Sequence, residues 1–258
     1  MNAILAALRP GWWRLQRALR PGGRSIRLNG RVTFAADPAV NAAGQNLTYE
    51  KPFFDAFLDE VRGECCVFDV GANQGLFAVA AALHNPRARV HAFEAAPAAF
   101  IVLKRQVRLN RLEGRVRMVH ALIGARSGGF APFHAAESAV GWASAAYAPP
   151  GTRTIRMPVI SLDEYAERND AIPNVIKIDV EGYELEVLKG ARRILRDNAA
   201  VIFLAVHHSF LATLGQSSGE LAKLIHAQGY RIARVDGSDA QDFGDADGEF
   251  ILRPDKSR

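Results

Sequence analysis

Two strand-like segments of the sequence end in side chains that can accept or hold a proton. The stretch VIKIDVEGYE carries Lys177 and Asp179 at alternate positions, and Glu181 follows where the apolar run ends. Alternate residues of a strand face the same side of a sheet, so we expect the Lys177 and Asp179 side chains to lie together. The next apolar run ends at His207. Carboxylates and an imidazole can remove a proton from a hydroxyl, so we predict that Asp179, Glu181, His207 and Lys177 form a catalytic site.

The same side chains allow two other interpretations. Asp179, Glu181 and His207 could hold one divalent ion, which would lower the pKa of a bound hydroxyl. The sequence has no close metal-ligand spacing around them, so we expect a site without metal. Lys177 and Asp179 could also form no more than a structural ion pair, because charges inside a strand are costly unless they are paired.

A glycine turn follows the first predicted strand of the α/β region. In VFDVGANQGLF, Asp69 ends the apolar run, and Gly71, Asn73 and Gly75 lie in the turn. A dinucleotide-binding turn has the pattern G-x-G-x-x-G and holds a pyrophosphate, whereas this turn has two glycines and an acidic side chain that repels phosphate. S-adenosylmethionine has no phosphate, and its ammonium and sulfonium groups are attracted to a carboxylate. We therefore predict that these four residues bind S-adenosylmethionine.

The second predicted strand ends in Glu94, which lies 23 residues beyond Gly71. An acidic side chain in this position of a βαβ unit accepts hydrogen bonds from ribose hydroxyls. We therefore expect Glu94 to bind the ribose of S-adenosylmethionine, and we include Ala121 from the third strand and Asp179 in the same cofactor site. Asp69 and Glu94 could instead be solvated or helix-capping residues that bind no ligand.

Strands and helices must alternate along the chain to position these side chains. We predict strands at 66–70, 88–94, 116–123, 175–180, 201–207, 230–235 and 248–253, and helices at 53–61, 75–84, 97–110, 183–197 and 217–228. Strands that alternate with helices of this length form parallel βαβ units, so the sequence predicts an α/β fold with a doubly wound, mostly parallel sheet. Segments 128–134 and 153–160 look β-like, and 135–152, rich in Ala, Ser, Gly and Pro, is predicted to be a loop.

Positive charge is concentrated at the start of the chain. The net charge of the 258 residues is +5, yet residues 1–36 contain seven arginines and no acidic residue, which leaves −2 for the remainder. We expect residues 1–36 to be a basic arm with a hairpin at Asn29-Gly30, and residues 37–258 to be the main domain. A nearly neutral main domain argues against a nucleic-acid partner. The arm, which also contains Trp12-Trp13, could contact a membrane surface or be a simple leader.

Cysteine usage and apolar run length indicate the compartment. Cys65 and Cys66 are adjacent and make no disulfide framework, which fits a reducing environment. The apolar runs are far shorter than the ~18 residues that suggest a membrane span. We therefore expect a cytoplasmic protein, with peripheral membrane association through the arm as an addition.

Three motifs in order resemble those of the FkbM-type methyltransferases. They are DVGANQG at 69–75, FEAAPAAFIVLKRQVRLN at 93–110 and IKIDVEGYELEVLKGA at 176–191, and the similarity extends from about Tyr49 to about Asp236. The resemblance implies a class I, S-adenosylmethionine-dependent methyltransferase with a Rossmann-like sheet of seven strands, the last one antiparallel. It also implies methyl transfer to a hydroxyl oxygen of a sugar, a glycolipid or polysaccharide, or a polyketide-like acceptor. The family often has a glutamate two residues before the histidine of the fifth strand, and here that position is Ala205.

Two other function classes use similar folds. A nicotinamide-dependent oxidoreductase is disfavoured by Asp69 and by the missing glycine of the turn. A non-catalytic partner- or membrane-binding protein would use the fold as a scaffold, and Ala205 is the residue that supports this alternative.

Overall fold

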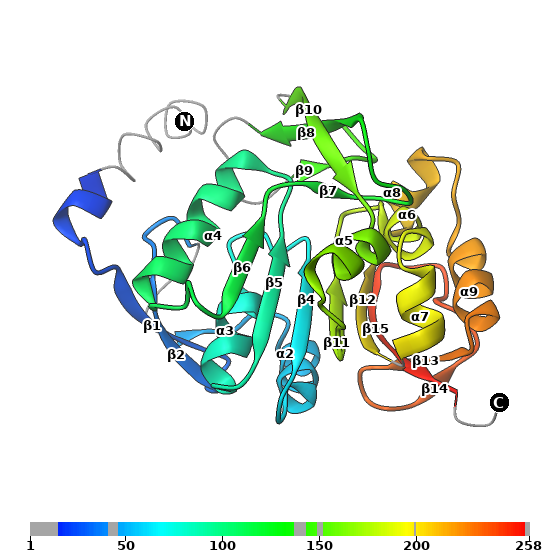
Figure 1. Cartoon of the computed structure of the whole chain (residues 1–258), viewed down its shortest axis with the longest axis horizontal. Coiled ribbons are helices and arrows are strands. Elements are labelled where there is room, and N and C mark those ends of the chain that lie inside the picture. Colours follow the sequence, from blue (N-terminus) through cyan, green and yellow to red (C-terminus); the bar gives the residue numbers. More distant parts are fainter. Residues whose placement is uncertain (1–14, 41–45, 137–142, 149–151, 199, 256–258) are drawn as a thin grey trace.

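A sheet of eight strands forms the centre of the computed structural model, which describes residues 15–40, 46–136, 143–148, 152–198 and 200–255 (Figure 1). The strands are β4 (Cys66–Val70), β5 (Arg89–Phe93), β6 (Val116–Val119), β11 (Val175–Ile178), β12 (Val201–Val206), β13 (Tyr230–Arg234), β14 (Asp239–Ala240) and β15 (Gly248–Pro254). Their order across the sheet is β6-β5-β4-β11-β12-β15-β13-β14.

The strand directions confirm the predicted sheet. Strands β6, β5, β4, β11 and β12 are mutually parallel, whereas β15 runs antiparallel to β12 and to β13. The seven predicted strands are all present, and the additional β14 is a two-residue strand at the edge. The order changes direction between β4 and β11, because β5 and β6 lie on one side of β4 and all later strands lie on the other. A ligand of an open α/β sheet binds at such a point.

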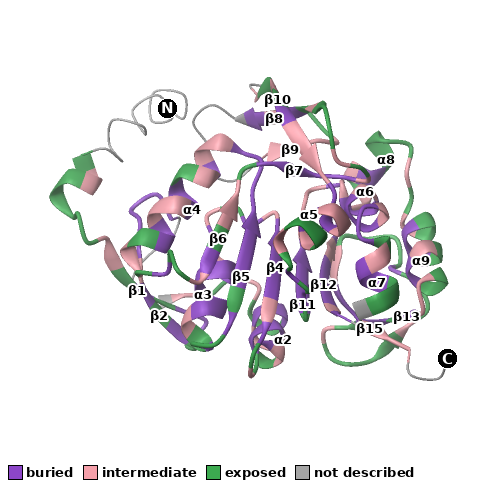
Figure 2. Cartoon of the chain, in the orientation of Figure 1, coloured by how far each residue is buried: buried purple, intermediate pink, exposed green. Residues whose placement is uncertain are grey.

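Helices cover both faces of this sheet (Figure 1). Apolar side chains from α2 (Lys51–Glu60), α3 (Leu76–His84) and α4 (Pro97–Leu109) pack into one buried cluster. Those from α5 (Leu162–Asn169), α6 (Glu184–Lys189), α7 (Arg192–Asn198) and α9 (Ser218–Ala227) pack into another. The central strands between these two layers are almost entirely buried (Figure 2), as expected for a parallel sheet.

The helix predicted over 183–197 is wrong in its continuity, because α6 ends at Lys189, with Gly190 as its cap, and α7 begins at Arg192. A Cβ atom at Gly190 would lie 2.1 Å from the carbonyl oxygen of Gly124, so the chain passes too close for any side chain. The N-terminus of α7 is capped by a residue from another helix. The carboxylate of Asp163 in α5 accepts hydrogen bonds from the backbone N–H groups of Arg193 and Ile194. Such a cap between distant segments leaves no local signal in the sequence.

A smaller sheet lies at the carboxyl-terminal end of the parallel strands, at the top of Figure 1. Its order is β7-β10-β8-β9, from β7 (Leu122–Ile123), β8 (Phe130–Ala136), β9 (Ala143–Ser144) and β10 (Thr152–Ile160). The single strand predicted over 116–123 is therefore two strands in different sheets. The predicted loop at 135–152 contains β9, and its segments 137–142 and 149–151 lie outside the described residues.

The predicted hairpin is present and packs on the main domain. Strands β1 (Arg24–Leu28) and β2 (Val32–Ala36) are antiparallel, and β3 (Asn46–Leu47) pairs with β1. The turn residues Asn29 and Gly30 have φ angles of 50° and 73°, as a tight Asn-Gly turn requires. Ile26 and Phe34 are buried in the same cluster as α2 and α3. The first 14 residues of the predicted arm lie outside the described residues, and none of the described helices has the length and apolarity to cross a membrane.

Candidate active site

The glycine turn after β4 brings the ends of three strands together. Gly71 has a φ angle of 78°, and a Cβ atom there would lie 1.8 Å from the carbonyl oxygen of Asp179. Its N–H and that of Ala72 both donate to the carbonyl oxygen of Phe93, over 3.0 and 2.9 Å. Only glycine combines this backbone conformation with such a close approach. The turn therefore fixes β4 against β5 on one side and against the end of β11 on the other.

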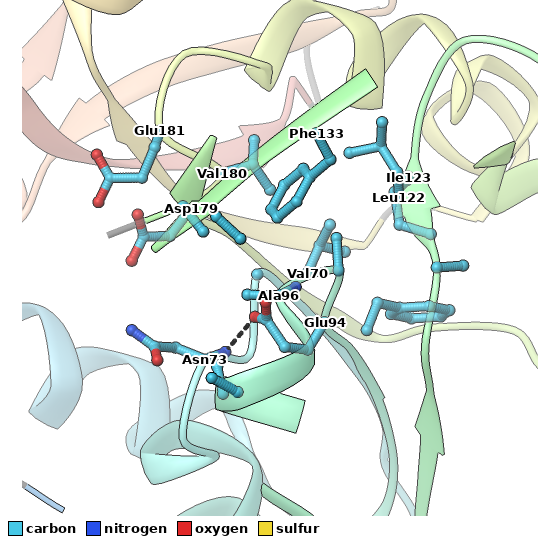
Figure 3. A pocket seen from close by; sticks show the side chains of 18 of the residues that line it. Val70, Asn73, Glu94, Ala96, Leu122, Ile123, Phe133, Asp179, Val180 and Glu181 are labelled. Carbon is cyan, nitrogen blue, oxygen red and sulfur yellow. Dashed lines mark hydrogen bonds between the residues drawn. The ribbon is translucent and has the colours of Figure 1, made fainter. Parts of the chain in front are cut away.

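A pocket opens beyond these strand ends (Figure 3). Much of its wall consists of alanines, namely Ala95, Ala96, Ala98, Ala99, Ala121, Ala135 and Ala143. Phe133 of β8 and Leu122 of β7 lie at one end in Figure 3, and the carboxylates of Asp179 and Glu181 lie at the other. The small sheet thus supplies an apolar wall, and the ends of the parallel strands supply the polar one.

Glu94 stands between the two ends of the pocket. Its Oε2 accepts a hydrogen bond from the backbone N–H of Asn73 over 2.7 Å, and its Oε1 accepts one from Ala96 over 2.6 Å (Figure 3 shows the first). Burial raises the pKa of this carboxyl to about 7, and the two N–H donors act against that rise. A carboxylate can accept about four hydrogen bonds, so each oxygen retains a lone pair for a ligand.

A cluster of charged side chains continues from the polar end. His207 follows β12 and places its Nε2 atom 3.7 Å from Asp179 Oδ1 and 3.5 Å from Glu181 Oε2. Its Nδ1 lies 2.8 Å from Oε1 of Glu184, a residue at the start of α6 whose side chain is fully buried. Glu181 has a φ angle of 53°, which is unusual for a residue other than glycine.

Glu184 determines the state of His207. A carboxylate at Nδ1 favours a proton on that nitrogen, so Nε2 faces Asp179 and Glu181. Burial lowers the pKa of His207, but the hydrogen bond and charge of Glu184, together with the charges of Glu181 and Asp179, outweigh burial and raise it to about 9. Burial also raises the pKa of Glu181 to about 7, against the effect of His207. The acidic neighbours of His207 therefore favour its protonated form.

Lys177 anchors the other side of Asp179. Its ammonium lies 3.0 Å from Asp179 Oδ2 and 4.7 Å from the ring centre of Phe77, and its side chain is 5% exposed. Burial alone would lower the pKa of Lys177, but Asp179 and Asp69 raise it, so the lysine remains charged. Lys177 and His207 together keep the pKa of Asp179 below its ordinary value in spite of burial.

The pocket includes most of the residues predicted to bind the cofactor, but not all of them. Gly71, Asn73, Glu94, Ala121 and Asp179 line it, as does Glu181, which was predicted to be catalytic. Asp69 is fully buried below the turn, at the position paired with Lys177 in the sheet, and does not line the pocket. Burial raises its pKa to about 6. Gly75 instead starts α3 against Leu103, where a Cβ atom would lie 2.5 Å from Leu103 Cδ1.

Sequence reasoning missed three parts of the site. Glu184 was inside the motif VIKIDVEGYE, and an acidic residue in the first turn of a helix after a strand end could have indicated it. Tyr49, just before α2, also lines the pocket, and nothing in its local sequence sets it apart. Phe133 lies on a strand of the small sheet, which was not predicted to reach the site.

The side chains that line the pocket suit S-adenosylmethionine in their chemistry and in their sequence from the apolar end of the pocket to the acidic end. Small and apolar side chains at the end near Phe133 and Leu122 suit a flat adenine. Glu94 has free lone pairs for ribose hydroxyls, and Gly71, where a Cβ atom would clash with the Asp179 carbonyl, keeps the turn at the edge of the pocket. Beyond them, Asp179 and Glu181 supply negative charge for the positively charged end of the ligand.

Comparisons with known proteins agree with this site. Residues 69–232 match the model of the methyltransferase FkbM domain. The 31-O-demethyl-FK506 methyltransferase FkbM of Streptomyces tacrolimicus is 30% identical over 239 residues, which cover 81% of this chain and 89% of that protein. The hexuronic acid methyltransferase AglP of Haloferax volcanii is 30% identical over 200 residues, 74% of this chain and 79% of that protein.

A solved structure of a methyltransferase FkbM from Methylobacillus flagellatus KT is 18% identical, with a TM-score of 0.49. The match covers 73% of this chain and 43% of the solved one. The sheet order, the pocket and the matches in sequence give one conclusion: the chain belongs to the FkbM family and is an S-adenosylmethionine-dependent methyltransferase.

Proposed function

We propose that this enzyme transfers a methyl group to a hydroxyl oxygen of a sugar or polyketide-like acceptor, with His207 as the general base. The observation that carries the proposal is the Glu184–His207 hydrogen bond, which directs Nε2 toward Asp179 and Glu181 beside the pocket. The names of the two relatives, which act on 31-O-demethyl-FK506 and on a hexuronic acid, support acceptors of these two classes.

The cofactor and the site residues have separate roles in the proposed reaction. Bound S-adenosylmethionine supplies a methyl group that its positively charged sulfur activates. An aliphatic hydroxyl is a poor nucleophile until a base takes its proton, and Nε2 of His207 takes it. Glu184 then stabilises the imidazolium through Nδ1, while Asp179, held by Lys177, lies on the other side of the ring. Glu94 and Gly71 hold the cofactor so that the two reactants are aligned.

The test replaces His207 by Ala and measures cofactor affinity and methyl transfer separately. Suitable first acceptors are 31-O-demethyl-FK506, a hexuronic acid and a neutral hexose, assayed with radiolabelled S-adenosylmethionine. Because Nε2 is the proposed proton acceptor, we expect turnover to fall by about two to four orders of magnitude while cofactor binding remains. Near-normal turnover of His207→Ala on an accepted substrate would exclude His207 as the base.

A divalent ion is the second candidate for activating the hydroxyl. Asp179, Glu181 and His207 each offer one ligand atom, and these atoms all lie within 4.8 Å of one another. A metal bound there would act as a Lewis acid and would occupy Nε2, so the two mechanisms exclude each other. We expect turnover to be unchanged in EDTA. Activity that is lost in EDTA and restored by Mg²⁺ or Mn²⁺ would assign the cluster to the metal.

The arginine-rich start of the chain is proposed to make a peripheral membrane contact. Its composition supports the proposal, although Arg17, Arg27 and Arg31 already bind Asp37, the Gly30 carbonyl and Asp59 within the protein. Deleting residues 1–14 should therefore reduce binding to anionic vesicles at low salt and leave cofactor affinity intact. A full-length protein that does not bind such vesicles would contradict the proposal.

A further inference from the structure

The register of β11, β12 and β15 places Asp179, Ala205 and Glu249 in one row across the sheet. Ala205 lies directly opposite Glu249 in the antiparallel pair of β12 and β15. Lys177 lies opposite Phe203 in the parallel pair of β11 and β12, and Asp179 and Ala205 each follow two residues later. Side chains two residues apart return to the same face of a sheet, and the 3.0 Å bond from Lys177 to Asp179 confirms this for β11.

Ala205 contributes only a methyl group to this row. Neighbouring strands are about 4.8 Å apart, so the backbones at Asp179 and Glu249 are about 10 Å apart. Glu249 lies at the start of β15. Because β15 and β12 run in opposite directions, the start of β15 lies beside the carboxyl-terminal end of β12. The carboxylate that β12 lacks at Ala205 is thus supplied by the adjacent strand.

Glu249 is partly buried, and nearby acidic side chains outweigh the nearby lysine. Across the described part of the chain, no side chain or backbone N–H donates a hydrogen bond to its carboxylate. Burial raises the pKa of Glu249 to about 7, and the charges of Glu50 and Asp179 add to this effect. Lys177, whose charge acts against this rise, is already bonded to Asp179. A carboxylate in this state is stabilised by any ligand that donates hydrogen bonds to it.

Aromatic rings lie on the other side of His207. Phe210 of α8 (His208–Thr213) stacks on the His207 ring with centroids 6.2 Å apart, and Tyr147 stacks on Phe210 at 5.5 Å. The side chain of Tyr147 is 38% exposed, so part of its surface is open to solvent. Carboxylates that accept hydroxyl hydrogen bonds, together with ring faces that contact C–H groups, are the surroundings that a sugar ring requires.

We propose that Glu249 is a positioning residue for the acceptor, which is a ring with several hydroxyl groups and no negative charge. The carboxylate accepts hydrogen bonds from hydroxyls next to the reacting one and so presents that hydroxyl to His207. An anionic acceptor would add negative charge to the surroundings of Glu249, where Glu50 and Asp179 already outweigh Lys177, and like charges brought together across an interface weaken binding. This inference rests on the proposed function, since it assigns the acceptor of the same site.

The test compares two acceptor probes that differ in one group. The probes are 4-nitrophenyl β-D-glucopyranoside and 4-nitrophenyl β-D-glucuronide, in which a carboxylate replaces the CH₂OH group. Calorimetry on the full chain saturated with S-adenosylhomocysteine measures their affinities without turnover. We expect the wild type to prefer the glucoside at least about tenfold, and Glu249→Gln to reduce the preference to about threefold or less. The matched control Glu113→Gln, at an exposed position away from the pocket, should leave the preference unchanged.

A relocation variant separates this role from a structural one. Glu249→Ala should lose at least about tenfold in glucoside affinity, and Ala205→Glu combined with Glu249→Ala should recover most of the loss, because directly opposed residues have Cβ atoms about 5 Å apart. Equal affinity for the two probes, no binding of either, or no recovery in the double variant would overturn the inference. Binding of S-adenosylmethionine and the His207→Ala assay judge the proposed function independently of these results.

Discussion

Glu94 uses both of its carboxylate oxygens within the protein before any ligand binds. Because each oxygen accepts a backbone N–H, a glutamine at this position would turn an N–H₂ group toward one of these donors. We therefore expect Glu94→Gln to weaken S-adenosylmethionine binding nearly as much as Glu94→Ala, by on the order of 1–3 kcal/mol. Calorimetry checks this, and a glutamine variant with wild-type affinity would show that Glu94 does not hold the ribose.

His207 makes the reaction dependent on pH. A general base accepts a proton only in its neutral form, and a pKa of about 9 leaves His207 mostly protonated at pH 7. We expect the turnover number to rise as the pH increases toward about 9. Glu184→Gln removes the charge that raises this pKa, so the rising limb should move to lower pH, whereas Glu186→Gln, on the same helix and paired with Lys189, should leave it in place. An unchanged limb in Glu184→Gln would contradict the assignment.

Alanine substitutions at Gly71 and Gly63 distinguish the cost of a steric clash from the cost of a left-handed backbone conformation. Both have positive φ angles, 78° and 62°, but a Cβ atom at Gly71 would meet the Asp179 carbonyl at 1.8 Å and one at Gly63 would meet nothing within 4 Å. Gly63→Ala should therefore cost about 1 kcal/mol of unfolding free energy, the cost of the left-handed conformation alone. Gly71→Ala should cost about 3 kcal/mol or more and abolish cofactor binding. Urea denaturation measures both, and equal costs would contradict the steric explanation.

The sequence indicated individual site residues where a local pattern marks them. Gly71, Asn73, Glu94 and Asp179 stand at strand ends or in a turn, and all line the pocket. The sequence placed Asp69 at the ligand, because a strand end cannot be separated by pattern alone from the buried position next to it. Glu249 carries no local signal at all, since its place beside the site follows from the register with β12.

At the scale of elements, α7 depends on a cap from α5. Two carboxylate oxygens of Asp163 accept the N–H groups of Arg193 and Ile194. Asp163→Ala removes the cap and should lower the unfolding free energy by about 1–2 kcal/mol. Glu164→Ala on the same helix, which only breaks a surface pair with Arg168, should change it by less than about 1 kcal/mol. Urea denaturation of the two variants makes the comparison, and similar losses would rule out the cap.

The positions of most elements were predictable because their apolar periodicity is local. Strand β4 occupies the predicted residues 66–70, and helices α3 and α9 begin within one residue of the predicted positions. The division of 116–123 between two sheets was not predictable, since both halves are equally apolar and only the tertiary fold separates them.

At the scale of the molecule, the sheet order and the family membership agree, and the oxidoreductase and non-catalytic alternatives are wrong for this chain. The order could be anticipated because the motifs that resemble the family specify it. The packing of the hairpin could not be, because the side chains that hold it to α4 lie far apart in sequence. Asp37 is fully buried and binds Arg17 and Arg105 over 2.9 and 2.6 Å.

Asp37 therefore joins the start of the chain to the main domain. Asp37→Asn leaves two arginines facing an uncharged group and should lower the unfolding free energy by about 1–3 kcal/mol, because a buried acceptor for charged donors is lost. The control Asp59→Asn also removes an arginine partner, Arg31, but at an exposed position, so we expect less than about 1 kcal/mol. Chemical denaturation decides the matter, and a loss no larger than that of the control would show that Asp37 does not hold the hairpin.

The place of β15 in the sheet has a consequence for biosynthesis. This last strand of the sheet lies between β12 and β13, both of which leave the ribosome before it. Until residues 248–254 emerge, β12 presents an unpaired apolar edge, and such edges pair with other chains. The nascent protein is then a half-sheet that cannot close and that lacks Glu249. We expect protection of the β12 edge by a chaperone to matter most in the interval between the emergence of β12 and that of β15, while the chain grows at roughly 5–20 residues per second.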